Sequence, residues 1–174
     1  MKVIRVFEGM VVAAFLTGCK MPAERMEQGE HHDDDVERQF YLPSAEASRV
    51  VSVSRGGPTR ASILVQTHRA AVKETGPKEA VARFGEVYSF SPNFIAVHRD
   101  EPTQIRFWNL QPDDQHDFML VDPAGNVLMS VLLAPVEETS YVFTFHREGL
   151  FNFYCAMHQP SMAGQILVLP PRSE

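Results

Sequence analysis

Hydrophobic and polar residues alternate along the C-terminal half of the chain with the period of two that β-strands show. In the segment TQIRFWN, Ile105 and Phe107 fall on one face, and in SYVFTFH the aromatic residues Tyr141, Phe143 and Phe145 fall on another. Similar short segments recur through this half and are separated by turn sequences such as DPAGN and REG. The pattern predicts an all-β domain.

Candidate strands fill residues 84–171. They are EVYSF, NFIAVHR, TQIRFWN, HDFMLVD, VLMSVLL, SYVFTFH, LFNFYC and GQILVL. Their length and spacing are typical of a β-sandwich with Greek-key connections. We therefore expect a single all-β, Greek-key β-sandwich of about eight strands.

Residues 49–83 give a weaker pattern. Two short strands, RVVSVSR and ASILVQT, are predicted on either side of the turn sequence GGP. The next segment, HRAAVKETGPKEAVARFG, contains helix-forming residues but is interrupted by Gly76 and Pro77, so it predicts short helical pieces at most. The sequence leaves open whether this extension packs on the main domain or stands apart.

Residues 1–18 have the features of an export signal. Lys2 and Arg5 precede an apolar run that is too short to span a membrane. The following LTGC resembles the bacterial lipobox, in which the cysteine, here Cys19, is acylated and becomes the first mature residue. An ordinary signal peptide with a chance cysteine is the alternative. We expect a lipoprotein-type signal peptide and lipidation at Cys19.

Residues 19–48 are polar and acidic and show no sustained apolar period, so we expect a flexible tether that holds the domain away from a membrane. The HHDDD run within it is better explained as a solvated charge cluster than as a metal site. The expected location is the periplasm, with a lipid anchor. Lys20, directly after the cysteine, favours the outer membrane by analogy with lipoproteins.

Length and charge narrow the classes of function. The chain has 174 residues, enough for one buried domain with an extension, and a formal net charge of −6. Removing residues 1–18 leaves 14 basic and 21 acidic residues, a net charge of about −7. With no basic patch, nucleic acid is not expected as a partner. An acidic surface suits a basic redox or delivery protein.

Cys155 lacks an obvious partner, so the state of its thiol needs an explanation. If Cys19 carries lipid, Cys155 has no disulfide partner in an oxidising compartment, and its thiol needs protection by burial or by a metal. The strand period places Cys155 on the same side as Phe151 and Phe153, facing the interior. Burial alone would explain many such cysteines.

The neighbouring residues favour a metal. His158 and Met162 follow Cys155 in a tight loop, and His116, which opens the segment HDFMLVD, is the best candidate for a fourth ligand. Two imidazoles and a thiolate in a trigonal set, with a weak axial thioether, form the ligand set of a mononuclear blue-copper site. The alternative is a buried thiol beside a surface histidine, with the methionine filling the core.

The region from Phe84 to Pro171 resembles the cupredoxins, the family of plastocyanin and azurin. The resemblance rests on HDF followed by FYCAMHQPSMAGQILV, and FSPNFIAVHRDEPTQIRFWNL is also similar to the cupredoxin domain of cytochrome oxidase subunit II and nitrous oxide reductase. It implies one copper ion held by His116, Cys155 and His158 in the equatorial plane and by Met162 on the axis. A binuclear centre would need a second cysteine in the loop.

The chain also departs from the family pattern. Asp117 stands where the family often has an asparagine whose amide pins the cysteine loop, and Ala156 lacks the hydroxyl common after the cysteine. Met157 is expected to point outward and to form an apolar collar with Pro160, where a partner would dock and exchange an electron through His158. The other histidines of the domain region are expected to be solvated or structural: His68, His98 and His146.

Three hypotheses for function follow. The first is a periplasmic electron carrier with one copper ion, and not an enzyme, because a saturated ligand set leaves no open position for substrate. The alternative is a copper-binding protein for copper storage, delivery to a copper-receiving protein, or tolerance. A cupredoxin-like domain that has lost its metal and acts only as a binding module is a third possibility.

Overall fold

A computed structural model of the chain describes residues 40–173. The expected signal peptide, Cys19 and the tether up to residue 39 lie outside these residues. The described strands are β1 (Val51–Ser54), β2 (Ala61–Ala71), β3 (Val87–Ser91), β4 (Phe94–His98), β5 (Thr103–Asn109), β6 (His116–Val121), β7 (Val127–Leu133), β8 (Glu137–Phe145), β9 (Gly149–Tyr154) and β10 (Ala163–Leu169). The helices are α1 (Lys78–Phe84) and two 3₁₀ turns, η1 (Ala47–Arg49) and η2 (Ala156–His158).

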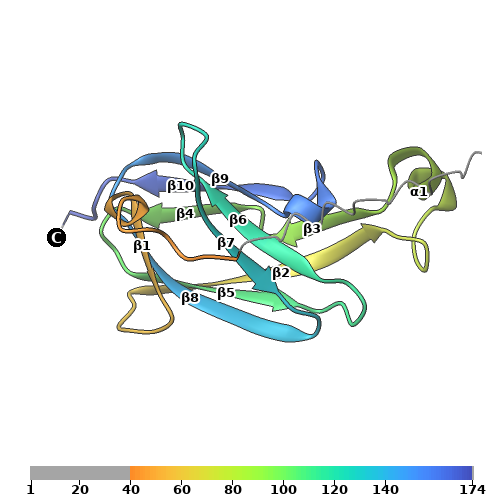
Figure 1. Cartoon of the computed structure of the whole chain (residues 1–174), viewed down its shortest axis with the longest axis horizontal. Helices are drawn as coiled ribbons and strands as arrows, with labels where there is room; N and C mark the ends of the chain where they lie inside the picture. The colour runs from red at the N-terminus through yellow and green to blue at the C-terminus, as the bar shows by residue number, and fades with distance from the viewer. Residues whose placement is uncertain (1–39, 174) are drawn as a thin grey trace, which may run out of the picture. The chain divides into compact units, whose positions relative to one another are not determined.

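The strands form two five-stranded sheets that pack as a sandwich (Figure 1). One sheet has the order β1-β8-β5-β2-β3 and the other β4-β10-β9-β6-β7. Both sheets are mixed, because β2 runs parallel to β5 and β10 runs parallel to β4. All eight strands expected between residues 84 and 171 are present, and the prediction of an all-β sandwich is confirmed.

The first sheet also includes strands from the extension that the sequence left undecided. β1 pairs with β8, and β2 pairs with β5, so that Ile63 lies opposite Ile105. The boundary expected at residue 84 therefore does not mark the start of the folded sandwich. The segment HRAA, read as helix-forming, continues β2 as far as Ala71, and the helix begins only after Pro77.

The core between the sheets is aromatic. Phe118 of β6 is fully buried, and its ring centroid lies 4.5 Å from that of Phe107 and 5.3 Å from that of Phe153. Each buried phenylalanine contributes roughly 1.5–3 kcal/mol of hydrophobic stabilisation. Ile105 and Phe143 are buried as their alternation predicted, so the faces assigned to these strands were correct.

Gly164 allows β10 to approach its neighbours closely. It lies opposite Phe153 in the β9–β10 ladder, and a Cβ atom there would collide with the Phe153 ring and with the backbone oxygen of Asn93. Only glycine fits at such a contact. The close approach fixes β10 beside the strand that leads into Cys155.

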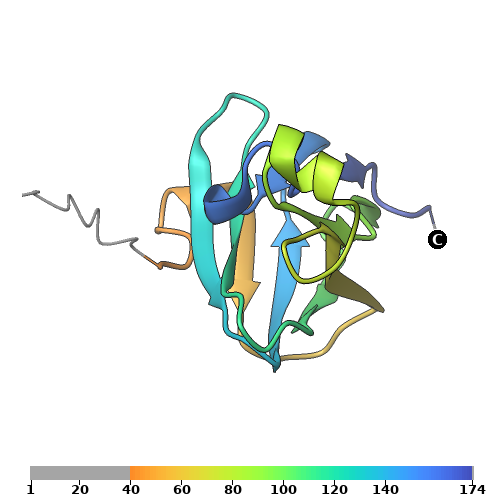
Figure 2. The ribbon, with the colours of Figure 1, turned by 90° about the vertical axis from the view of Figure 1, so that its right-hand side faces the viewer.

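One end of the sandwich gathers the elements that matter for the chemistry. β2 runs to the right in Figure 1 toward α1, β3 returns from α1 beside it, and the loop containing η2 lies at the same end. Figure 2 looks onto this end, with α1 in lime and η2 in blue facing the viewer. None of the helices within residues 40–173 has both the length and the hydropathy that a membrane span requires.

Candidate metal centre

Two neighbouring strands bring the predicted ligands together. His116 is the first residue of β6, and Cys155 directly follows β9, which runs antiparallel to β6 with Met119 opposite Tyr154. The start of one strand and the end of the other therefore meet at the same end of the sheet. The 3₁₀ turn η2 then places His158 three residues beyond the cysteine.

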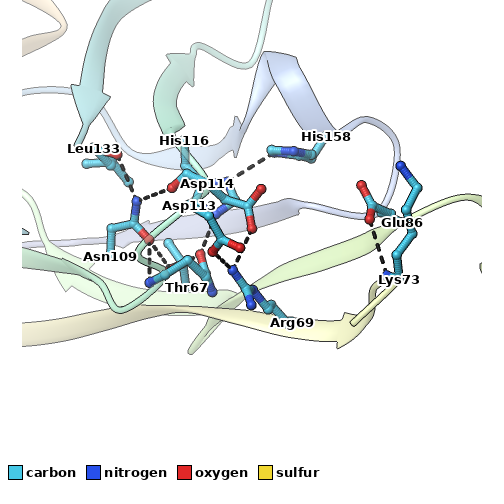
Figure 3. Close-up of polar contacts among 11 residues, drawn as sticks. Thr67, Arg69, Lys73, Glu86, Asn109, Asp113, Asp114, His116, Leu133 and His158 are labelled. Carbon is cyan, nitrogen blue, oxygen red and sulfur yellow. Dashed lines mark hydrogen bonds and ion pairs between the residues drawn. The ribbon is translucent and has the colours of Figure 1, made fainter. Parts of the chain in front are cut away.

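The three side chains converge on one point. His116, Cys155 and His158 each offer a ligand atom, and these atoms all lie within 4.8 Å of one another. The two Nδ1 atoms are 3.0 Å apart (Figure 3), and Sγ of the cysteine lies 3.9 Å from Nδ1 of His116 and 3.4 Å from Nδ1 of His158. His116 and Cys155 are fully buried and His158 is half-buried. The group could hold a metal ion.

Met162, the predicted axial ligand, is fully buried beside this group. The backbone N–H of Cys155 donates to the carbonyl of Met162 (2.9 Å), and the N–H of Met162 donates to the carbonyl of His158 (3.0 Å). These bonds close the ligand loop on itself, so its backbone positions the cysteine, histidine and methionine as one unit. Coordination by the methionine sulfur stays a prediction.

Asp117 holds the cysteine loop from the neighbouring strand. Its carboxylate Oδ1 accepts a hydrogen bond from the backbone N–H of Ala156 (2.7 Å), and its own backbone N–H lies 3.5 Å from Sγ of Cys155. Its side chain is almost fully buried. The carboxylate thus pins the loop where the resemblance led us to look for an asparagine amide.

Burial sets the protonation of the metal-free site. It lowers the pKa of His116 from 6.5 to about 4, with the nearby His158 acting in the same direction. Burial raises the pKa of the Cys155 thiol from 9.0 to about 12, and the Asp117 side chain adds to this rise. Both groups are therefore neutral near pH 7. A bound cation would displace the thiol proton, because the thiolate is the metal-binding form.

Tyr88 packs against both imidazoles and was missed by the sequence reasoning. Its ring centroid lies 4.2 Å from that of His158 and 5.1 Å from that of His116. Burial and a hydrogen bond with Asp114 raise the pKa of Tyr88 from 10.0 to about 12. The alternation in EVYSF places this residue on the same inward face as Phe90, which is the one sequence signal that could have found it.

A buried polar group behind His116 was also missed. It consists of Thr67, Asn109 and Gln111, of which Thr67 and Asn109 are labelled in Figure 3. Gln111 Oε1 lies 2.5 Å from Nε2 of His116. Little in the sequence pointed to this group, since Gln111 belongs to a polar loop and Thr67 to the undecided extension.

The remaining histidines of the domain lie outside the ligand group. Nδ1 of His98 is 2.7 Å from the backbone oxygen of Pro170, and His68 is exposed on β2. His146 contacts Ser52, with 3.0 Å between Nε2 and Oγ, and it also contacts the carboxylate of Asp100. All three thus have the structural or solvated surroundings expected of them.

The predicted apolar collar differs from the structure in one member. Met157 is half-buried and packs against the hydrophobic core, so it does not point outward as expected. Pro160 is exposed. Met157 and His158 both lie in the 3₁₀ turn η2, and both are half-buried.

Comparison with solved structures defines the class of fold. The chain has the cupredoxin fold. Auracyanin B is similar with a TM-score of 0.51 and 14% sequence identity, over 70% of this chain and 99% of that protein. No protein-family model matches the sequence, and no curated protein matches it.

Two further solved structures match with lower TM-scores. Auracyanin A, a blue copper protein from Chloroflexus aurantiacus, has 19% identity and a TM-score of 0.44, over 62% of this chain and 98% of its own. Copper nitrite reductase from Nitrosomonas europaea has 12% identity and a TM-score of 0.49, over 66% of this chain and 51% of its own. At such identities the likeness concerns the fold, and the chemistry must be argued from the residues.

Proposed function

We propose that this protein is a type 1, or blue, copper protein that carries single electrons between redox partners. The observation that carries the proposal is the convergence of His116, Cys155 and His158 within 4.8 Å at one end of a cupredoxin fold. Met162, buried in the same loop, would supply the axial thioether.

The donor set fits copper better than other common metals. A thiolate and a thioether are soft ligands that suit Cu(I), and imidazoles suit Cu(II) as well. A structural zinc site would use four strong ligands from cysteine, histidine or carboxylate side chains, and here the fourth neighbour is a methionine. Copper bound to this set would supply a one-electron couple, Cu(I)/Cu(II).

The surrounding structure suits rapid electron transfer. His116 opens β6, Cys155 directly follows the adjacent strand β9, and Asp117 ties the cysteine loop to β6. Ligands held this firmly change position little between two oxidation states, which keeps reorganisation small. The half-buried imidazole of His158 is the ligand nearest the surface and provides the route by which an electron would enter or leave.

We propose that the protein is not an enzyme. Four ligands on one ion leave no open position for a substrate, whereas catalytic metal sites keep one. The partners would then be redox proteins rather than small molecules. The net negative charge of the chain favours a partner with a basic docking face.

The proposed location is the periplasm, with attachment to a membrane, the outer membrane being slightly favoured, through a lipid on Cys19. This rests on the export-signal pattern and the LTGC segment, both outside the described residues. Several acyl chains would give a durable anchor. Metabolic labelling with a radioactive fatty acid, using Cys19→Ser as the control, tests the anchor separately from the copper site.

Voltammetry and metal exchange of the full chain together test the function. We expect a reversible one-electron wave and copper that stays bound when a chelator of moderate affinity is added. Poor reversibility together with transfer of copper to a recipient within seconds would instead favour copper storage, delivery or tolerance. Failure of the protein to retain any copper would favour a metal-free binding module.

A further inference from the structure

We infer that Gln111 is a positioning residue that fixes the tautomer of His116 before a metal arrives. The inference rests on the proposed copper site, because it concerns which nitrogen of His116 is left to bind the ion. A neutral imidazole carries one proton, and a ligand nitrogen must be free of it. A hydrogen-bond acceptor at the other nitrogen decides the outcome.

The acceptor is a side-chain carbonyl. Oε1 of Gln111 lies 2.5 Å from Nε2 of His116, while Nδ1 of the same ring faces Nδ1 of His158 at 3.0 Å. A proton on Nε2 is donated to the carbonyl oxygen and leaves the Nδ1 lone pair directed at the metal position. Gln111 is 4% exposed and His116 is fully buried, so water does not compete readily for this bond.

Three further hydrogen bonds, all made by the side chain of Asn109, hold the backbone of the glutamine in place. Nδ2 of Asn109 donates to the backbone oxygens of Asp114 (2.8 Å) and Leu133 (3.0 Å), which turns Oδ1 of Asn109 toward the loop. That Oδ1 accepts the backbone N–H of Gln111 (3.1 Å). Figure 3 shows Asn109 between Leu133 and the loop that carries Asp114. The amide of Asn109 therefore anchors the glutamine backbone beside His116.

Thr67 provides a hydroxyl donor beside the oxygen of the glutamine amide. Its hydroxyl lies 2.8 Å from Oε1 of Gln111 and 3.0 Å from Oδ1 of Asn109, and it donates its single proton between these two oxygens. With the amide reversed, the NH₂ group of Gln111 would donate to His116, and the proton of His116 would sit on Nδ1, where the metal must bind. Thr67 is 2% exposed, so its hydroxyl has no alternative in bulk water.

The arrangement also explains a structural feature of β2. This strand is longer than its partners, and its outer part carries Thr67 past the end of the parallel pairing with β5, which stops at Gln66. The extension that the sequence left undecided thus supplies a hydroxyl that hydrogen-bonds to Gln111. The fold joins the N-terminal strands to the metal centre through this contact.

The experiment is long-range ¹H–¹⁵N NMR of the metal-free full chain, followed by Cu(II) titration against a competing chelator. We expect His116 of the wild-type protein to be protonated at Nε2 alone. Gln111→Met removes the acceptor at similar length, so it should yield a mixture of tautomers and weaken Cu(II) binding about 10- to 100-fold. Gln111→Glu keeps an acceptor oxygen and should restore the single tautomer.

The matched control is Gln165→Met, because the amide of Gln165 contacts Asn152 on β9 and not a ligand. It should change neither the tautomer nor the affinity. A proton on Nδ1 of His116 in the metal-free wild type, or unchanged tautomer and affinity in Gln111→Met, would overturn the inference. If Gln111→Met does not fold, the wild-type and Gln111→Glu spectra still decide. An Nε2 proton with no copper–thiolate spectrum would refute the proposed function alone.

Discussion

The carboxylate of Asp117 accepts a hydrogen bond from the backbone N–H of Ala156, with 2.7 Å between Oδ1 and N. This bond links the first residues of β6 to the loop that follows Cys155. A buried charged acceptor and a backbone donor form one of the stronger hydrogen bonds available to a protein. It holds two parts of the proposed ligand set at a fixed separation.

Replacing Asp117 should therefore separate two effects. Asp117→Ala leaves the Ala156 N–H without its acceptor and should lower the free energy of unfolding by about 1–3 kcal/mol. Asp117→Asn keeps an acceptor oxygen, so it should cost less, and by removing a negative charge near Sγ it should raise the reduction potential of the copper form. Urea unfolding of the metal-free protein and voltammetry of the copper form provide the two measurements. Equal stability of the two variants would show that the bond contributes little.

Met162→Leu tests the axial ligand without disturbing the core. The two side chains have similar volume, so the free energy of unfolding should fall by less than about 1.5 kcal/mol. The copper form should show an altered EPR spectrum and a higher reduction potential, since losing a donor destabilises Cu(II) more than Cu(I). The matched control is Met129→Leu in β7, which is equally buried. Identical EPR spectra for wild type and Met162→Leu would remove the methionine from the ligand set.

The stability of the metal-free protein should depend on pH at both extremes. Because the pKa of folded His116 is about 4, the unfolded chain alone takes up its proton as the pH falls from 6.5, and the folded state loses about 3 kcal/mol by pH 4. The Cys155 thiol has the opposite effect: its folded pKa is about 12, so stability falls as the pH rises above 9.0. Urea unfolding across this range should show a plateau between the two limits.

Single variants test which residue causes each loss of stability, the one at low pH (the acid arm of the profile) and the one at high pH (the alkaline arm). His116→Gln should flatten the acid arm, and Cys155→Ser should flatten the alkaline arm, because each removes the titrating group. His68→Gln, on the exposed part of β2, should leave both arms in place. If the loss of stability at low pH persists unchanged in His116→Gln, groups other than His116 cause it.

Gly164→Ala should be strongly destabilising for steric reasons. The added Cβ would meet the Phe153 ring and the Asn93 oxygen, so β10 must shift, at a cost of about 1–3 kcal/mol or more. Gly56→Ala is the control, because a Cβ at that position meets nothing within 4 Å. Thermal unfolding of the two variants gives the comparison, and equal midpoints would contradict the close approach seen between β9 and β10.

The strands after residue 84 were predictable because each is a short, largely apolar segment bounded by turn residues, and β5 also alternates clearly. β1 and β2 were harder, since their place in the sheet depends on pairing with β8 and β5, which lie far along the chain. Local sequence carries no information about such parallel and long-range pairing. The burial of Val51 and Val65 becomes clear only once the partners are in place.

The candidate ligands were predictable for a different reason. Cys155, His158 and Met162 are close in sequence, and their residue types are uncommon enough to indicate a metal. Gln111 and Thr67 could not be found in this way, because a glutamine in a polar loop and a threonine in a weak strand are ordinary residues. Their role depends on two distant segments meeting behind His116, which only the fold brings about.

The most direct test of the proposed site is the visible and EPR spectrum of the full chain after one equivalent of Cu(II) is added. We expect an intense thiolate-to-copper band that bleaches on reduction, returns on reoxidation, and is absent from Cys155→Ser. A weak spectrum without thiolate character, or an equally intense band in Cys155→Ser, would contradict the assignment of Cys155 as a copper ligand.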